Sequence, residues 1–173
     1  KYQVNTLPDL LKRATGVDVV QSGGLGKPTS IFMRGTESDQ VLVLIDGMPI
    51  VSGLSTVYGL SGIPNSLLER IEIIKGPASS LYGSEAVGGL INIITKNPTN
   101  APVFSADYFT TTYFESNLDL GMKFNAGKKA TSLLGVNYFN YDQVIDKDND
   151  NFTDVTLSKR ISVFNKWSFN TWQ

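Results

Sequence analysis

The feature that most constrains the fold is a stretch from Asn117 to Ala126 in which polar and apolar side chains alternate. Successive side chains of a β-strand point to opposite faces of the sheet, so this pattern predicts a strand with one polar and one apolar face. The apolar face carries Leu118, Leu120, Met122, Phe124 and Ala126. A protein that contains such a strand must cover this face with other protein groups or with lipid.

The same alternation recurs in three more segments after Pro98, at Val103 to Glu115, Thr131 to Tyr141 and Ile161 to Thr171. Their connections are unequal: residues 115–117 and 127–129 predict tight turns, whereas residues 142–160 form a long acidic loop. Strands of about ten residues with one apolar face and with loops of unequal length are typical of membrane β-barrels. Alternation alone is equally consistent with a soluble antiparallel meander that packs one face on the first part of the chain.

Four strands are too few for a barrel, which needs about eight. An open sheet edge in lipid would leave backbone groups unpaired. If the strands cross a membrane, we therefore expect this chain to be a fragment of a longer protein. In a soluble module, by contrast, the face that carries Leu118 and Leu120 would have to be covered by protein.

The chain before Pro98 has the mixed pattern of a small α+β domain. Leu7, Leu10, Leu11 and Ala14 have helical spacing, with Pro8 in the expected first turn. Short runs rich in Val and Ile predict five strands, at residues 17–21, 29–35, 40–47, 69–76 and 88–96. The connection at residues 48–69 is too long for a hairpin turn, and loops of that length in compact domains are usually functional.

Composition excludes several classes of function. The 173 residues include no cysteine and no histidine, which removes thiolate nucleophiles, disulfides, Ser-His-Asp triads and His/Cys metal sites. No paired acids stand at a recognisable catalytic spacing, so we expect no enzyme. The net charge is -1 with scattered Lys and Arg, which gives no basis for nucleic-acid binding.

Metals with oxygen ligands remain open, and one segment suits them. Asp146, Asp148, Asp150 and Asp154 alternate through the long acidic loop, a pattern of hard ligands in a flexible segment that suits Ca²⁺. Asn151 replaces the turn glycine of an EF-hand and Leu157 replaces its bidentate glutamate, so the loop is not an EF-hand. A solvated acidic loop without metal is the alternative.

Two segments carry a resemblance to a known family: "SIFMRGTESDQVLVLIDGMPI" (residues 30–50) and "ERIEIIKGPASSLYGSEAVGGLINIITK" (residues 69–96). Together they resemble the plug domain of TonB-dependent outer-membrane receptors of Gram-negative bacteria, over residues 7–99. The resemblance implies an α+β plug domain at residues 1–99. It also implies that residues 100–173 are the first four antiparallel transmembrane strands of an incomplete 22-stranded β-barrel.

The resemblance also implies a function and partners. The expected activity is TonB-dependent active transport of a scarce nutrient across the outer membrane. TonB, with ExbB and ExbD, would act through an N-terminal segment that is not visible here. Outer-membrane lipid would surround the barrel, and a surface lipoprotein would be a further partner. No organic cofactor is implied.

Within the family the chain most resembles the cobalamin (vitamin B12) receptors, so the expected ligand is a corrinoid; haem or a ferric siderophore is the alternative. The resemblance implies that two plug loops rise to meet the ligand, and that Ca²⁺ held by aspartates orders the first long extracellular loops. The implied ligand-binding residues are Leu54, Ser55, Thr56, Val57, Tyr58, Ser79, Ser80 and Tyr82.

A set of charges in the plug would sit inside a polar lumen. Arg34 and Arg70 lie in the two matching segments, and Glu69 and Glu72 flank Arg70. A buried arginine requires a carboxylate partner. The resemblance implies that this partner comes from the plug itself or from inward-facing barrel acids, and an ordinary surface ion pair is the alternative.

Overall fold

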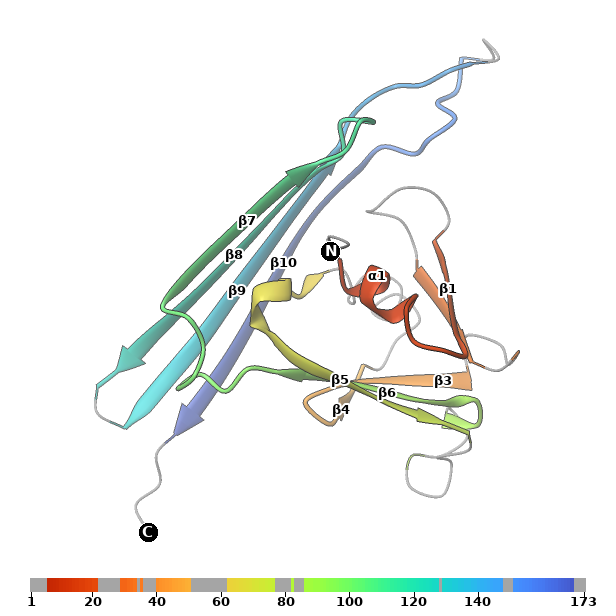
Figure 1. Cartoon of the computed structure of the whole chain (residues 1–173). Helices are drawn as coiled ribbons and strands as arrows, with labels where there is room; N and C mark the ends of the chain where they lie inside the picture. Colours follow the sequence, from red (N-terminus) through yellow and green to blue (C-terminus); the bar gives the residue numbers. More distant parts are fainter. Residues whose placement is uncertain are drawn as a thin grey trace.

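The protein consists of a plug and a tall sheet, here called the wall, against which the plug lies (Figure 1). The computed structural model describes residues 6–21, 29–33, 35, 40–50, 62–76, 82, 86–127, 129–147 and 151–169. The plug comprises the described residues before Pro98, and the wall comprises strands β7 to β10 after it. In Figure 1 the wall strands run side by side well past the plug, and the loop between the last two extends further still.

The plug begins with a short helix, α1 (Leu7–Leu11). The Thr6 hydroxyl caps it, because this oxygen accepts the Asp9 backbone N–H at 3.4 Å and donates to the Asp9 carboxylate at 2.7 Å. Leu7 and Leu11 are buried in the plug core. The helix is one turn shorter than the apolar spacing predicts, since Ala14 follows its end.

Two sheets build the rest of the plug. Strands β1 (Val17–Gln21) and β2 (Thr29–Met33) form an antiparallel pair. The larger sheet has the order β4-β3-β6-β5, with β3 (Val41–Ile45), β4 (Met48–Pro49), β5 (Leu68–Lys75) and β6 (Gly89–Thr95). Strands β3 and β6 are parallel, and the other pairs are antiparallel. The five predicted strands are confirmed, whereas the two-residue β4 was not predicted.

The wall is a four-stranded antiparallel sheet in the order β10-β9-β8-β7. Its strands are β7 (Phe104–Thr110), β8 (Ser116–Ala126), β9 (Ala130–Tyr141) and β10 (Ser158–Phe169). The face toward the plug buries Asn117, Asp119 and Asn137, whereas Met122, Phe124, Ile161 and Val163 are exposed on the other face. The predicted division into a polar and an apolar face is confirmed for β8, whereas β9 buries Leu133, Phe139 and Tyr141 beside Asn137 on the face toward the plug.

The first wall strand is shorter than predicted. Alternation suggests a strand from Val103 to Glu115, but β7 ends at Thr110 and residues 111–115 form a turn. The Thr111 N–H donates to the Glu115 carbonyl at 3.0 Å, and Phe114 adopts the left-handed region with φ 61°. The turn therefore interrupts a pattern that the polar and apolar residues alone would continue.

In the part of the chain that the structure describes, no helix has the length and apolar character needed to cross a membrane. The core of the plug is built from its sheets and α1. Met33, Ile91 and Ile93 are fully buried there.

Candidate functional site

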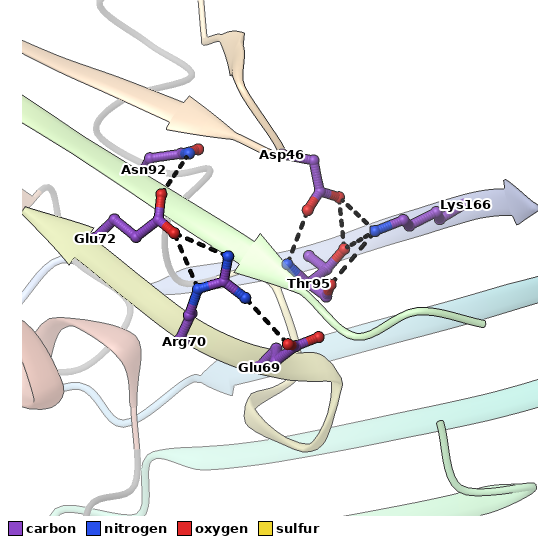
Figure 2. A network of polar contacts seen from close by, with 7 residues as sticks. All are labelled: Asp46, Glu69, Arg70, Glu72, Asn92, Thr95 and Lys166. Atoms are coloured by element: carbon purple, nitrogen blue, oxygen red, sulfur yellow. Dashed lines mark hydrogen bonds and ion pairs between the residues drawn. The ribbon is translucent and has the colours of Figure 1, made fainter. Parts of the chain in front are cut away.

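A polar network runs from the edge of the plug sheet to the wall (Figure 2). It begins on β5, crosses β6 to the turn between β3 and β4, and ends on β10. Its members are Glu69, Arg70, Glu72, Asn92, Asp46, Thr95 and Lys166.

The outer end of the network is Arg70, which lies between two glutamates of its own strand. Arg70 Nη1 lies 3.0 Å from Glu69 Oε1, and its Nε and Nη2 each lie 2.9 Å from Glu72 Oε1. The Arg70 side chain is 55% exposed, so this is the geometry of a surface pair, worth at most about 1 kcal/mol. Arg34, the other predicted plug arginine, lies outside the described residues.

Asn92 links this charge cluster to the β3–β4 turn. Its Nδ2 donates to Glu72 Oε2 at 3.2 Å, and its Oδ1 accepts the Gly47 backbone N–H at 3.0 Å. The turn itself is a two-residue connection in which Asp46 (φ 50°) and Gly47 (φ 81°) both have positive φ, as an Asp-Gly hairpin favours. The sequence "IDGM" carries this turn signal, and Asn92 fixes it.

Asp46 is the centre of the inner end. Its Oδ1 accepts the Thr95 N–H at 2.9 Å, and its Oδ2 accepts the Thr95 hydroxyl at 2.5 Å and lies 3.1 Å from Lys166 Nζ. Burial raises the pKa of Asp46, but the bonds from Thr95 and the bond and charge of Lys166 outweigh it, so the pKa is below the ordinary 3.8. Asp46 therefore stays ionised at neutral pH.

Lys166 joins the wall to the plug. Besides Asp46, its ammonium lies 3.0 Å from Thr95 Oγ1 and 3.3 Å from the Thr95 carbonyl. A second wall lysine, Lys123 on β8, donates to the Thr99 carbonyl at 3.2 Å. These inward positions follow from the alternation of the wall strands, but their plug partners could not be read from it.

An apolar contact lies beside these lysines. Leu67, at the end of the 3-10 helix η3 (Asn65–Leu67), is fully buried with Ala101 and Leu133, and Phe164 packs against them. A Cβ added to Gly121 or Gly135 would lie 2.9 or 2.5 Å from a Leu67 methyl. These two glycines pair across β8 and β9, so they form a notch that receives the leucine.

The inner face of the wall carries a polar cluster that the sequence did not single out. Asn137 Nδ2 donates to Asn117 Oδ1 at 2.8 Å and to Asp119 Oδ1 at 2.7 Å, and its Oδ1 accepts from Arg160 Nη2 at 3.2 Å. The Arg160 guanidinium also lies 5.6 Å from the centre of the Phe139 ring. Asn117, Asp119 and Asn137 lie on the polar face that the alternation predicts, whereas Arg160 falls in the predicted loop at residues 142–160 and Phe139 is apolar.

Most of the expected ligand-binding residues fall outside the described part of the chain. This holds for Leu54 to Tyr58, Ser79 and Ser80. Tyr82 is described and is 42% exposed. The ligand-binding assignment stays a prediction.

Two of the four aspartates of the acidic loop are described, Asp146 and Asp154, whereas Asp148 and Asp150 are not. Asp146 Oδ2 accepts the Asn151 N–H and Asp154 Oδ2 accepts the Lys147 N–H, both at 3.1 Å. Among the described residues, no group of three or more acidic side chains is placed to hold a metal ion. The oxygen donors suit Ca²⁺ in kind, and the calcium site stays a prediction.

Comparison with known proteins identifies the family. The model for the TonB-dependent Receptor Plug Domain matches residues 1–90. Among solved structures, the ferric yersiniabactin uptake receptor FyuA from Yersinia pestis aligns over 95% of this chain and 26% of its own, with 19% identity and a TM-score of 0.74. The ferric enterobactin receptor PfeA from Pseudomonas aeruginosa aligns over 85% of this chain and 24% of its own, with 25% identity and a TM-score of 0.60.

The FrpB iron transporter from Neisseria meningitidis aligns over 96% of this chain and 26% of its own, with 15% identity and a TM-score of 0.64. The chain spans about a quarter of the length of these receptors. These receptors are named for iron or ferric siderophores, which does not support the expected cobalamin specificity. The chain belongs to the TonB-dependent receptors, which lie in the outer membrane of Gram-negative bacteria and are not enzymes.

Proposed function

We propose that this chain forms the plug and first wall strands of a receptor that imports a ferric siderophore by TonB-dependent active transport. The observation that carries the proposal is the joining of a plug, matched over residues 1–90, to a wall with a polar inner face and an apolar outer face. The wall would continue into a closed barrel, of 22 strands as the resemblance implies. TonB, energised by ExbB and ExbD, would supply the work.

The dimensions of the wall support a membrane position. Strand β9 contains 12 residues, or about 40 Å at about 3.3 Å each, and a tilt of about 45° reduces its height to about 28 Å. This matches the apolar band of outer-membrane barrels, about 25 Å. Aromatic side chains also gather near one end of the outer face, where Trp167 lies edge-on to Phe124 with ring centres 5.8 Å apart.

The choice of a ferric siderophore follows from the relatives, since the receptors for yersiniabactin and enterobactin both share this fold. A corrinoid and haem are the alternatives. We place the ligand at the plug loops that contain Leu54 to Tyr58 and Ser79 to Tyr82. Hydroxyl and apolar side chains together in these loops suit a large ligand of mixed polarity.

We further propose that Asp146, Asp148, Asp150 and Asp154 hold Ca²⁺ when it is present. Four carboxylates in one loop repel each other, so a divalent cation would neutralise them and order the loop. Nearby exposed apolar side chains, Tyr113, Phe114 and Phe152, would be the surface offered to a surface lipoprotein.

The test is uptake by the full-length receptor in Gram-negative cells that lack their own siderophore, haem and cobalamin receptors. We expect ⁵⁵Fe-enterobactin or ⁵⁵Fe-yersiniabactin to accumulate only in cells with TonB. Uptake of cyanocobalamin or haemin instead would replace the siderophore proposal, and uptake of all four without TonB would contradict the mechanism. The calcium proposal is tested by measuring the Kd of the ligand with and without a chelator, and an unchanged Kd would contradict it.

A further inference from the structure

Two of the contacts between the plug and the wall should respond differently when the two parts separate. One is the leucine notch, defined here as Leu67 against Gly121, Gly135 and Leu133. The other is the lysine latch, defined as Lys166 against Asp46 and Thr95. Both lie on the inner face of the wall, and the latch is the inner end of the network in Figure 2.

The leucine notch is closed to water. Leu67 and Leu133 are both fully buried. Because the two glycines have no side chains, the Leu67 methyls approach the strand backbones closely. Opening the notch would expose apolar surface and leave a void with nothing to fill it.

The lysine latch is charged and is less deeply buried than the notch. The side chains of Lys166 and Asp46 are 29% and 20% exposed. When Lys166 leaves, water can solvate its ammonium, and the two bonds from Thr95 then hold the Asp46 carboxylate without the neutralising charge. We therefore expect these two bonds to open more often once the lysine is released.

The two contacts also attach to different parts of the plug. Leu67 precedes β5, on the edge of the sheet, and the latch holds the β3–β4 turn and the end of β6. Releasing Lys166 would free the β3–β4 turn from the wall while the segment before β5 stays in its notch.

We propose that the lysine latch opens reversibly while the leucine notch stays closed, so that the plug moves against the wall about the notch as its fixed point. Lys166 is then a positioning residue for transport. This inference rests on the proposed function for its biological role, but the difference between the two contacts can be measured without transport.

Hydrogen exchange in the purified full-length receptor measures this difference. The reporters are the Thr95 N–H, bonded to Asp46, and the Leu67 N–H, bonded to the Pro64 carbonyl at 2.9 Å. We expect Lys166→Met to speed exchange at Thr95 by about tenfold and to leave Leu67 unchanged, whereas the matched control Lys166→Arg keeps the charge and the slow exchange. Raising salt should act on the wild type as Lys166→Met does, though less strongly.

Two results would overturn the proposal. Unchanged exchange at Thr95 in Lys166→Met would mean that the lysine does not hold the turn. Equal acceleration at Thr95 and Leu67 would mean that the two contacts open as one unit.

Cross-linking then tests the role in transport. A short bismaleimide between Asp46→Cys and Lys166→Cys would lock the latch, and a disulfide between Leu67→Cys and Gly135→Cys would lock the notch. We expect the locked latch to reduce ⁵⁵Fe-enterobactin uptake at least about tenfold without changing its binding on ice, and the locked notch to change neither. Normal uptake with the locked latch, or blocked uptake with the locked notch, contradicts the proposal. If the unlinked receptor takes up no probe, the proposed function fails while the exchange result still decides the latch.

Discussion

The plug and the wall are built from similar strands but place their apolar residues in opposite ways. In the plug, Ile91 and Ile93 on β6 are fully buried between the sheet and the other plug elements. In the wall, Ile161 on β10 is 70% exposed, whereas Asn137 on the next strand is almost fully buried. A sheet that buries asparagine on one face and exposes isoleucine on the other is suited to a barrel wall, with a polar lumen on the first side and lipid on the second.

The surroundings of a sheet, and not its strand pattern alone, therefore decide which of its faces is the interior. In water the plug follows the ordinary rule that apolar side chains are buried. In the wall, some polar side chains are buried and bond to one another, as Asn137 does with Asn117 and Asp119. The contacts between the two regions are therefore mixed and include an apolar contact at Leu67, a hydrogen bond between the Ser66 and Ser105 hydroxyls, and an ion pair at Lys166.

The largest difference in stability should come from truncating an isoleucine in each of the two regions. Ile91→Ala should destabilise the plug by about 2–5 kcal/mol, because the buried side chain leaves a cavity. Ile161→Ala should cost less than about 1.5 kcal/mol in a bilayer, because lipid fills the space. Urea unfolding of the full-length receptor in vesicles measures both, with protease protection reporting on the plug. Equal costs would break the comparison.

A charge on the outer face of the wall tests whether lipid is its solvent. Val163 is exposed in the middle of β10, so Val163→Arg should cost about 2–4 kcal/mol of folding free energy in vesicles. Val163→Leu is the matched control and should be nearly neutral. If Val163→Arg leaves the folding free energy in vesicles unchanged, this face contacts water or protein and not lipid.

The leucine notch can be tested by filling the space at Gly135. Gly135→Ala places a methyl group against Leu67, which should cost about 1–3 kcal/mol in the plug–wall contact. Adding Leu67→Ala should restore part of the loss, so the double variant would be more stable than the sum of the single effects predicts. Additive losses in a double-mutant cycle by urea unfolding would show that the two residues do not meet.

Much of the fold could be predicted from the sequence because its signals are local. Alternation predicts the four wall strands, although β7 ends earlier and β10 begins earlier than it indicates, and runs of Val and Ile between glycines predict β1, β2, β3, β5 and β6. The missed features depend on backbone geometry: the turn that ends β7 relies on the positive φ of Phe114, and β4 has only two residues.

The polar network was harder to predict from the sequence because its contacts join residues far apart in the chain. The pairing of Arg70 with Glu69 and Glu72 follows from their alternation on one strand. By contrast, Lys166 meets Asp46 and Thr95 only because the plug docks on the wall, and nothing in the three local sequences indicates this. The leucine notch could not be predicted for the same reason, since Gly121 and Gly135 form it only when Leu67 packs against them.

The smallest effect concerns the pH dependence of the lysine latch. The pKa of Asp46 is lowered by Thr95 and Lys166 below its ordinary 3.8, so its contribution to stability is fully present above 3.8 and is lost as the pH falls through the lowered value. Asp46→Asn should therefore flatten the pH dependence of plug stability below 3.8 and leave it unchanged between pH 5 and 8, where the group stays ionised. Urea unfolding of the full-length receptor across that range measures this. A variant that instead changes the slope near pH 6 would show that Asp46 titrates there, and that the latch does not hold the carboxylate in its charged form.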